Sequence, residues 1–347
     1  MKVKLKPLRE QIIVLTGATS GIGLVTARKA ARAGALLVLA ARNEDALQQL
    51  KAELESGDAA VETVPADVGR EEDVRRISEA ALARFGGFDT WINNAAVSIY
   101  GKVEEVSIAD QRRLFETNYW GMVYGSRIAC EHLRKSGGKL INIGSSLSER
   151  AIPIQGVYSA SKAAVMGFTD ALRMELAQDG APVSVTLIKP GAIDTPYKQH
   201  AGNYMGVEGK NPPPVYAPET VARAILYATE HDLRETVVGA GGKMLTVMGT
   251  LAPKISDKVM GKVMPFLQRT DKPVPGIQRG ALYAPGEELR ERGGYAMTFE
   301  RSLYTTAVRH KVLSTVIAVG AGALLYSLSR PARPARRRMD RRRQVEG

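Results

Sequence analysis

The chain has 347 residues, 44% of them hydrophobic, and a formal net charge of +12, so it can form one large domain with an appendage or two domains. Residues 330–347 hold eight arginines against two acidic residues, which is half of the excess charge, so we expect no nucleic-acid-binding body. The single cysteine, Cys130, excludes an intramolecular disulfide and fits a reducing compartment. Together with only four scattered histidines, it predicts no metal site.

Residues 11–240 alternate short apolar runs with segments of helical periodicity. We predict strands at 11–17, 35–42, 59–67, 88–96, 138–146 and 181–191, with an edge strand at 235–240. We predict helices at 23–34, 44–56, 71–86, 110–137, 156–178 and 218–230. Apolar strands that alternate with helices indicate a parallel sheet covered on both faces. The expected fold is therefore a doubly wound α/β fold of about seven strands.

The regular pattern weakens after about Lys198. Residues 202–219, "GNYMGVEGKNPPPVYAPE", are rich in Gly, Asn and Pro and predict an ordered loop or flap. Later helical patches, such as "APKISDKVMGKVMPFLQ", are interrupted by Gly and Pro. We therefore divide the chain into four parts. They are a main domain at residues 1–240, an irregular or helical extension at 241–308, an apolar helix at 309–329 and a disordered arginine-rich tail at 330–347.

Val312 to Leu328 is a run of 17 residues without charge, flanked by basic residues on both sides. As a helix it would span about 25 Å, slightly less than the roughly 30 Å hydrocarbon core of a bilayer. We predict a C-terminal anchor that tethers a cytoplasmic domain to the membrane. The alternatives are a helix packed on the protein's own core or on a second subunit, and a helix lying obliquely in the membrane surface.

The segment "TGATSGIG", residues 16–23, directly follows the first predicted strand. Gly17, Gly21 and Gly23 permit a tight turn and let the backbone approach a pyrophosphate at a helix N-terminus. The alternative is a tight turn without a ligand. At the end of the second strand, Arg42 suits a ribose 2′-phosphate, so we expect NADP(H) in preference to NAD(H); otherwise Arg42 is a solvated residue at a strand end.

The stretch "GVYSASKAAV", residues 156–165, places Tyr158 four residues before Lys162. On a helix the two side chains share one face, one turn apart. An ammonium beside a phenol favours the phenolate and lowers a tyrosine pKa that is normally about 10. The pair therefore predicts a proton donor that works near neutral pH, whereas the alternative is a core tyrosine with a snorkelling lysine.

Taken together, these segments resemble the short-chain dehydrogenase/reductase family over about residues 9–240. The matching motifs are "TGATSGIG" at 16–23, "ADV" at 66–68, "NNAA" at 93–96, Asn118 in "ETNYWG", "IGSS" at 143–146, "YSASK" at 158–162 and "PGAIDTP" at 190–196. The resemblance implies a Rossmann-like fold and reversible hydride transfer between NADP(H) and a carbonyl carbon. Ala96 stands where the family commonly has glycine, a difference that does not touch the chemistry.

The resemblance also implies a catalytic set. Tyr158 would be the general acid/base, Lys162 would hold the nicotinamide ribose and lower the tyrosine pKa, and Asn118 would hold a water in the proton relay. Ser145 would orient the substrate, because the family's serine usually stands thirteen residues before the tyrosine; Ser146 is the fallback.

The same resemblance implies a set of cofactor-binding residues. Asp67 and Val68 would contact adenine, Asn93 would lie beside the cofactor and stabilise the central strand, and Thr195 would meet the nicotinamide carboxamide. The complete set is Gly17, Thr19, Ser20, Gly21, Ile22, Gly23, Arg42, Asp67, Val68, Asn93, Asn94, Ala95, Tyr158, Lys162, Pro190, Gly191, Ile193 and Thr195.

The flap from Gln199 to Pro218 carries little charge and suggests the substrate class. Its large side chains, together with the one just before it, are Tyr197, Tyr204, Met205, Val215 and Tyr216. They suit an apolar carbonyl or alcohol, and a membrane anchor would add access to lipid-soluble compounds. By analogy with the family we expect a homodimer or homotetramer that uses the helices around 110–135 and 156–178.

Two other functions stay open. The chain could be a non-catalytic NADP(H)-binding sensor or scaffold at a membrane, although the complete Asn118, Ser145, Tyr158 and Lys162 set favours an enzyme. It could also be a nucleotide-sugar epimerase or dehydratase on a related fold, although it lacks a clear larger C-terminal domain for a sugar nucleotide.

Overall fold

The computed structural model describes residues 3–239, 241, 249 and 251–302. The predicted anchor and the arginine-rich tail lie outside these residues, so the prediction of a membrane-spanning segment there stays a prediction. Among the helices that the structure describes, none has the length and apolar character needed to cross a bilayer.

A seven-stranded parallel sheet forms the centre, as the sequence predicts. The strands are Ile12–Thr16 (β1), Leu36–Ala41 (β2), Val61–Pro65 (β3), Thr90–Asn93 (β4), Gly138–Ile143 (β6), Val183–Pro190 (β7) and Glu235–Val238 (β10). Their spatial order is β10-β7-β6-β4-β1-β2-β3. The order reverses between β1 and β4, and in such a sheet the crevice at the carboxyl ends of these strands is the usual ligand site.

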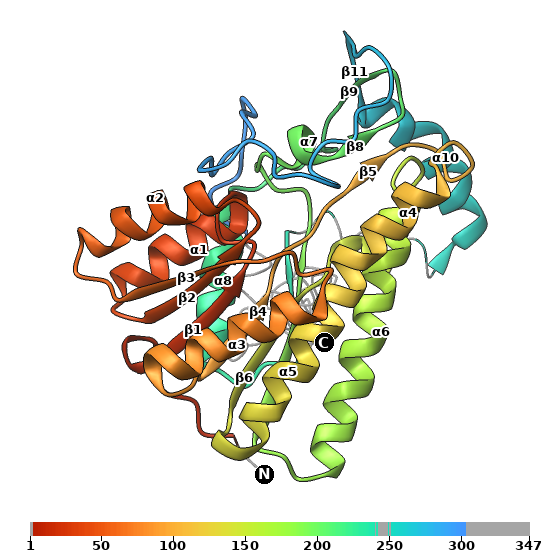
Figure 1. Ribbon diagram of the computed structural model, residues 1–347. Coiled ribbons are helices and arrows are strands. Elements are labelled where there is room, and N and C mark those ends of the chain that lie inside the picture. The colour runs from red at the N-terminus through yellow and green to blue at the C-terminus, as the bar shows by residue number, and fades with distance from the viewer. Residues whose placement is uncertain (1–2, 240, 242–248, 250, 303–347) are drawn as a thin grey trace, which may run out of the picture. The chain divides into compact units, whose positions relative to one another are not determined.

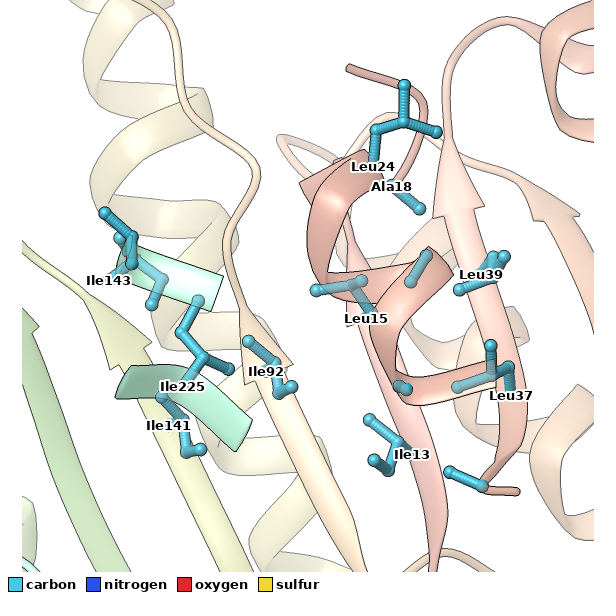
Figure 2. Close-up of a cluster of buried hydrophobic side chains, with 14 of the residues drawn as sticks. Ile13, Leu15, Ala18, Leu24, Leu37, Leu39, Ile92, Ile141, Ile143 and Ile225 are labelled. Atoms are coloured by element: carbon cyan, nitrogen blue, oxygen red, sulfur yellow. The ribbon is translucent and has the colours of Figure 1, made fainter. Parts of the chain in front are cut away.

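Helices cover both faces of the sheet because successive strand residues point in opposite directions. Ile13 and Leu15 of β1 face a cluster that includes Leu24 of α1 (Gly21–Arg32) and Ile225 of α8 (Pro218–Glu230), and Figure 2 shows these side chains together. Val14, between the two, joins the opposite cluster. That cluster is packed by α3 (Glu71–Phe85), α5 (Gly121–Ser136) and the end of α6 (Gly156–Gln178).

The long helix predicted at 110–137 is a single helix interrupted by a wider turn. It consists of α4 (Ile108–Phe115), a π-helical segment at Glu116–Trp120 and then α5. π-Helical turns are rare and often occur at functional sites, and this one contains Asn118. The periodicity of apolar residues alone does not reveal such a local change of hydrogen bonding.

Local sequence explains where several elements begin and end. The Asn43 side chain accepts a hydrogen bond from the Ala46 amide, which caps α2 (Glu44–Glu55). Pro218 occupies the first turn of α8, where its missing N–H costs nothing. Gly86 ends α3 with a φ of 77°, a left-handed conformation that glycine adopts without strain.

The segment predicted as a loop or flap contains short regular elements. These are α7 (Tyr197–His200), β8 (Gly202–Asn203) and β9 (Val207–Gly209). β8 pairs with β5 (Ile99–Tyr100), and β9 pairs with β11 (Arg269–Pro273). The sequence does not predict these strands, because each is too short for a periodicity and depends on a partner distant in the chain.

The extension contributes one further described helix, α10 (Pro253–Leu267), at the position of the predicted helical patch. Figure 1 shows α10 near the end of the molecule that also carries α7, β8 and β9. Residues 278–300 then return along the main domain, where the Leu289 amide donates to the Thr19 carbonyl and Phe299 bonds with Val215 and Ala217. The described part of the extension is therefore packed against the main domain.

Candidate active site

A cavity of about 460 Å³ lies at the carboxyl ends of the central strands. One of its walls is the loop after β1, and others are the loops after β4, β6 and β7. The sequence-predicted residues that line it are Gly17, Ser20, Gly21, Ile22, Gly23, Asn94, Ala95, Ser145, Tyr158, Lys162, Pro190, Gly191, Ile193 and Thr195. The tertiary fold thus brings most of the predicted site into one cavity.

The glycine loop is closely packed and leaves no space for side chains at two positions. A Cβ atom at Gly23 would lie 1.9 Å from the Gly17 carbonyl oxygen, and one at Gly17 would lie 2.8 Å from Ala95 Cα. Asn94 fixes the loop, since its Nδ2 donates to the Thr16 and Gly17 carbonyls at 2.9 and 3.0 Å. This loop at the N-terminus of α1 therefore fits the pyrophosphate of a dinucleotide.

Tyr158 and Lys162 lie one turn apart on α6, as predicted, and both face the cavity. The Lys162 Nζ lies 5.8 Å from the centroid of the Tyr158 ring. It donates to the Ile143 carbonyl at the end of β6, at 2.9 Å. That hydrogen bond connects α6 to the neighbouring strand and fixes the position of the ammonium.

The predicted direction of the Tyr158 pKa is wrong for the protein alone. Burial raises the pKa of Tyr158 to about 12, although hydrogen bonds with the Ser145 and Tyr197 hydroxyls work against this rise. Burial also lowers the pKa of Lys162 to about 8. Both shifts have one cause, because a water-poor cavity penalises the charged form of each group. The spacing of the two residues gives their proximity but not the desolvation.

Ser145 is the serine that interacts with Tyr158, so the geometry favours it over Ser146. It caps the short 3-10 helix Ser146–Ser148 by accepting a hydrogen bond from the Leu147 amide at 3.1 Å. Ser148 is buried, and its hydroxyl accepts from the Ser145 amide at 3.1 Å. The turn therefore holds the Ser145 hydroxyl next to the tyrosine.

Asn118 is buried beside the cavity instead of lining it. Its Oδ1 accepts from the Val97 amide at 2.8 Å, and its Nδ2 donates to the Val97 carbonyl and to the Ser161 hydroxyl. It connects the π-helical segment to α6 and to the loop after β4. The predicted role in a proton relay stays a prediction.

Tyr197 is a polar member of the site that the sequence suggests only as an apolar lining residue. Its ring lies edge-on to that of Tyr158, with centroids 5.8 Å apart. Its hydroxyl lies 2.5 Å from the Ser98 hydroxyl and accepts from Gln155 Nε2 at 3.0 Å. Burial raises the pKa of Tyr197, and its contact with Tyr158 raises it further while it lowers the pKa of Tyr158. These are the directions expected of a Tyr197 hydroxyl that donates to the Tyr158 oxygen.

The predicted adenosine contacts Arg42, Asp67 and Val68 do not line the cavity, and Arg42 is bonded to the extension. The Arg42 guanidinium donates to the backbone carbonyls of Ala281, Leu282 and Ala284 at 2.7–3.3 Å. Asp67 pairs with Arg113 at 2.5 Å. Thr19 and Val68 are buried and do not line the cavity. The contacts of residues 281–289 with this region were not predicted, because nothing in local periodicity relates these segments.

Asn93 also lies outside the cavity lining and is part of a buried polar network. It accepts from Trp91 Nε1 at 2.8 Å and donates to Asn142 Oδ1 at 2.8 Å and to the Ser126 hydroxyl at 3.2 Å. These bonds connect β4 to β6 and α5, which agrees with the predicted stabilisation of the central strand. The structure gives it no direct path to the cavity.

The far end of the cavity is apolar, but only part of the predicted set lines it. Tyr197 and Tyr216 do so, whereas Tyr204, Met205 and Val215 pack elsewhere. Tyr204, for example, donates to Asp110 at 2.5 Å. Other side chains contribute instead, from outside the flap Leu147, Ile152, Met264 and Leu267, and from within it Pro212, Pro213 and Pro214.

Comparison with known proteins agrees with this geometry. Residues 11–204 match the family model described as short chain dehydrogenase. The chain belongs to the short-chain dehydrogenase family. Over 324 residues it is 47% identical to uncharacterized oxidoreductase YxnA of Bacillus subtilis, covering 92% of this chain and 91% of the relative. It is therefore an NAD(P)-dependent dehydrogenase or reductase.

Two further similarities support the family membership. The chain is 38% identical to 11-beta-hydroxysteroid dehydrogenase A of Arachis hypogaea over 202 residues, 58% of this chain, and it spans little more than half, 56%, of that relative. A solved short chain dehydrogenase from Burkholderia cenocepacia in complex with NADP superposes with a TM-score of 0.62 and 26% identity, covering 74% of this chain and 99% of that one.

Proposed function

We propose that this protein reversibly transfers hydride between NADP(H) and the carbonyl or alcohol group of an apolar substrate. The observation that carries the proposal is the single cavity that joins the glycine loop, the Ser145, Tyr158 and Lys162 side chains and an apolar end. When bound, the dinucleotide supplies or accepts the hydride.

The protein's own residues handle the substrate oxygen and its proton. Ser145 and Tyr158 donate hydrogen bonds to that oxygen, where negative charge develops during reduction. Tyr158 passes its proton to the oxygen, and in the reverse direction its phenolate removes the alcohol proton. The Tyr197 hydroxyl and the Lys162 ammonium both favour that phenolate, and Lys162 would also hold the nicotinamide ribose.

Two cations at the adenosine end support a preference for NADP(H). Burial lowers the pKa of Arg42, and the Arg113 charge lowers it further while Asp67 works in the opposite direction. Both guanidinium groups donate to the Leu282 carbonyl, so they lie close together. A ribose 2′-phosphate is a doubly charged acceptor that suits such a pair. One carboxylate, Asp67, already pairs with Arg113, whereas Arg42 donates only to uncharged backbone carbonyls, so Arg42 is the proposed phosphate ligand.

The substrate class follows from the apolar end of the cavity. Leu147, Ile152, Met264 and Leu267 contribute no hydrogen-bonding side-chain groups apart from the weak thioether of Met264. A lipid-soluble ketone, aldehyde or secondary alcohol is therefore the expected substrate. A hydroxysteroid, the compound class in the name of the plant relative, is one such alcohol.

The assembly and location remain part of this proposal. Trp120 beside α5 and Met174 on α6 are exposed large side chains, which supports a homodimer or homotetramer formed through these helices. The uncharged run 312–328 supports a membrane tether for a cytoplasmic catalytic domain.

The test is a titration of the purified protein in mild detergent with NADPH and with NADH. A panel of apolar ketones and aldehydes follows, with nicotinamide absorbance as the readout. We expect turnover that Tyr158→Phe abolishes, while NADPH binding is nearly unchanged. Normal turnover by Tyr158→Phe would refute the catalytic role, and binding without any turnover would favour the sensor.

A further inference from the structure

Helix α10 exposes a row of large apolar side chains that no part of the described chain covers. Ile255, Val259, Val263 and Phe266 are 66%, 42%, 41% and 78% exposed. Residues at positions i, i+4, i+8 and i+11 of a helix lie on one face, so these four form one continuous stripe. A contiguous exposed apolar stripe on a folded protein usually marks an interaction surface.

The two neighbouring rows of the same helix have different character. The residues that follow the first three stripe residues by one position are Ser256, Met260 and Met264, all buried against the protein. The residues that precede the same three by one position are Lys254, Lys258 and Lys262, all exposed. Around the helix, a buried row is thus followed by the apolar stripe and then by a row of lysines.

This arrangement is typical of a helix that lies in the plane of a membrane surface. The apolar stripe enters the boundary between headgroups and acyl chains, while long lysine side chains extend to the anionic headgroups. The charges near the helix agree with such a partner. The Asp257 carboxylate is already paired with Arg150, which leaves the three lysines as the main charge beside the stripe, with Arg269 exposed just after the helix.

We propose that α10 docks this protein on an anionic lipid bilayer. The occupant is a lipid surface instead of a protein partner, because a row of three lysines beside an apolar stripe matches negative headgroups above hydrocarbon. The docking does not need the uncharged segment 312–328, which carries a separate prediction.

The position of α10 relates the docking to the cavity. Met264 and Leu267, on the inner side of the helix, line the apolar end of the site, and Met264 lies directly after Val263 of the stripe. A docked α10 therefore brings the apolar end of the cavity next to the bilayer. This last step rests on the proposed function, since it identifies the substrate as a lipid-soluble molecule that enters from the membrane.

The test uses the full-length protein and a local probe on α10. Cys130 is buried, so Val259→Cys introduces the one accessible thiol, which is labelled with an environment-sensitive fluorophore. The probe is then mixed with vesicles of phosphatidylcholine containing about 30% phosphatidylglycerol. We expect a blue shift and quenching by doxyl groups in the acyl chains. A label at Leu82→Cys on α3, 44% exposed in the native protein and outside the helices proposed for assembly, should show neither change.

A second measurement separates the lipid from other occupants. Lys254→Gln/Lys258→Gln/Lys262→Gln should weaken sedimentation with the anionic vesicles by roughly fivefold per lysine, and added salt should weaken the native protein in the same way. The triple variant of exposed residues Arg32→Gln/Arg84→Gln/Lys135→Gln on α1, α3 and α5 is the charge-matched control and should bind as the native protein does.

Three results would overturn the docking proposal. The first is no binding of the native protein to these vesicles. The second is vesicle binding during which the label at residue 259 stays in water, which would place the contact in another segment. The third is shielding of that label without lipid, accompanied by a doubled mass in light scattering, which would make the stripe an interface between two copies. Docking without turnover on apolar carbonyls would instead refute only the proposed function.

Discussion

Removal of the Tyr197 hydroxyl tests how the cavity controls the catalytic proton. In Tyr197→Phe the ring remains beside Tyr158, but the Ser98 hydroxyl and Gln155 Nε2 lose the partner that lies 2.5 and 3.0 Å away. Tyr158 also loses a donor that lowers its pKa. The Ser145 hydroxyl remains as the other donor, so the variant should retain activity.

The structure gives the expected size of the effect. A hydrogen bond to a charged group contributes about 1.5–3 kcal/mol, and about 1.4 kcal/mol corresponds to one pKa unit. We therefore expect the Tyr158 pKa to rise by about one unit or more. Alcohol oxidation needs the phenolate, so its rate increases with pH through this pKa. The rising, low-pH part of the variant's pH–rate profile should move to higher pH by about one unit. At any one pH on that rising part, the variant's rate should be at least tenfold lower than the native rate.

The assay is kcat for alcohol oxidation between pH 6 and 10, measured at saturating dinucleotide. Tyr204→Phe is the matched control, because Tyr204 lies in the same segment and donates to Asp110 at 2.5 Å, outside the cavity. Its pH profile should match that of the native protein. If Tyr197→Phe kept the native profile, or if both variants shifted equally, the proposed donation from Tyr197 to Tyr158 would be refuted.

Arg42→Ala should weaken NADPH binding by about 10- to 100-fold more than NADH binding, the size of one charge-assisted contact, in fluorescence titrations; an equal loss for both would mean that Arg42 serves only the carbonyls of 281–284. Gly23→Ala should abolish dinucleotide binding and lower the free energy of unfolding by about 1–3 kcal/mol, because the added Cβ would lie 1.9 Å from a backbone oxygen. The control in the same urea titration is Gly167→Ala, whose added Cβ would have no atom within 4 Å. Burial lowers the pKa of Lys139 to about 7, whereas in the unfolded chain this lysine keeps its proton up to its ordinary pKa of 10.5. Above about pH 7 the unfolded state therefore binds more protons than the native state. The free energy of unfolding should then rise with pH by about 1.4 kcal/mol per pH unit for this group. Lys139→Met should lose that slope in urea unfolding at pH 7, 8 and 9, and exposed Lys135→Met should keep it; equal slopes would contradict the charge state of Lys139.

The sheet and the core of the site could be predicted from the sequence because both depend on short-range patterns. Apolar runs of strand length and helical periodicity are local properties, and they predict the seven strands of the sheet and their order of alternation with helices. The spacing of Gly17, Gly21 and Gly23 between a predicted strand and a predicted helix is also a local feature, and it predicts a tight turn. Tyr158 and Lys162 share a face because four residues make about one helical turn.

Only the tertiary structure decides the properties that arise between distant segments. Tyr197 becomes the partner of Tyr158, and Ala281 becomes an acceptor for Arg42, through contacts across 39 and 239 residues of chain. The direction of the Tyr158 pKa depends on how completely the surrounding walls exclude water, which the spacing to Lys162 does not contain. The exposed stripe on α10 has the same cause, because periodicity gives a helix its apolar faces but only packing determines which of them stays uncovered.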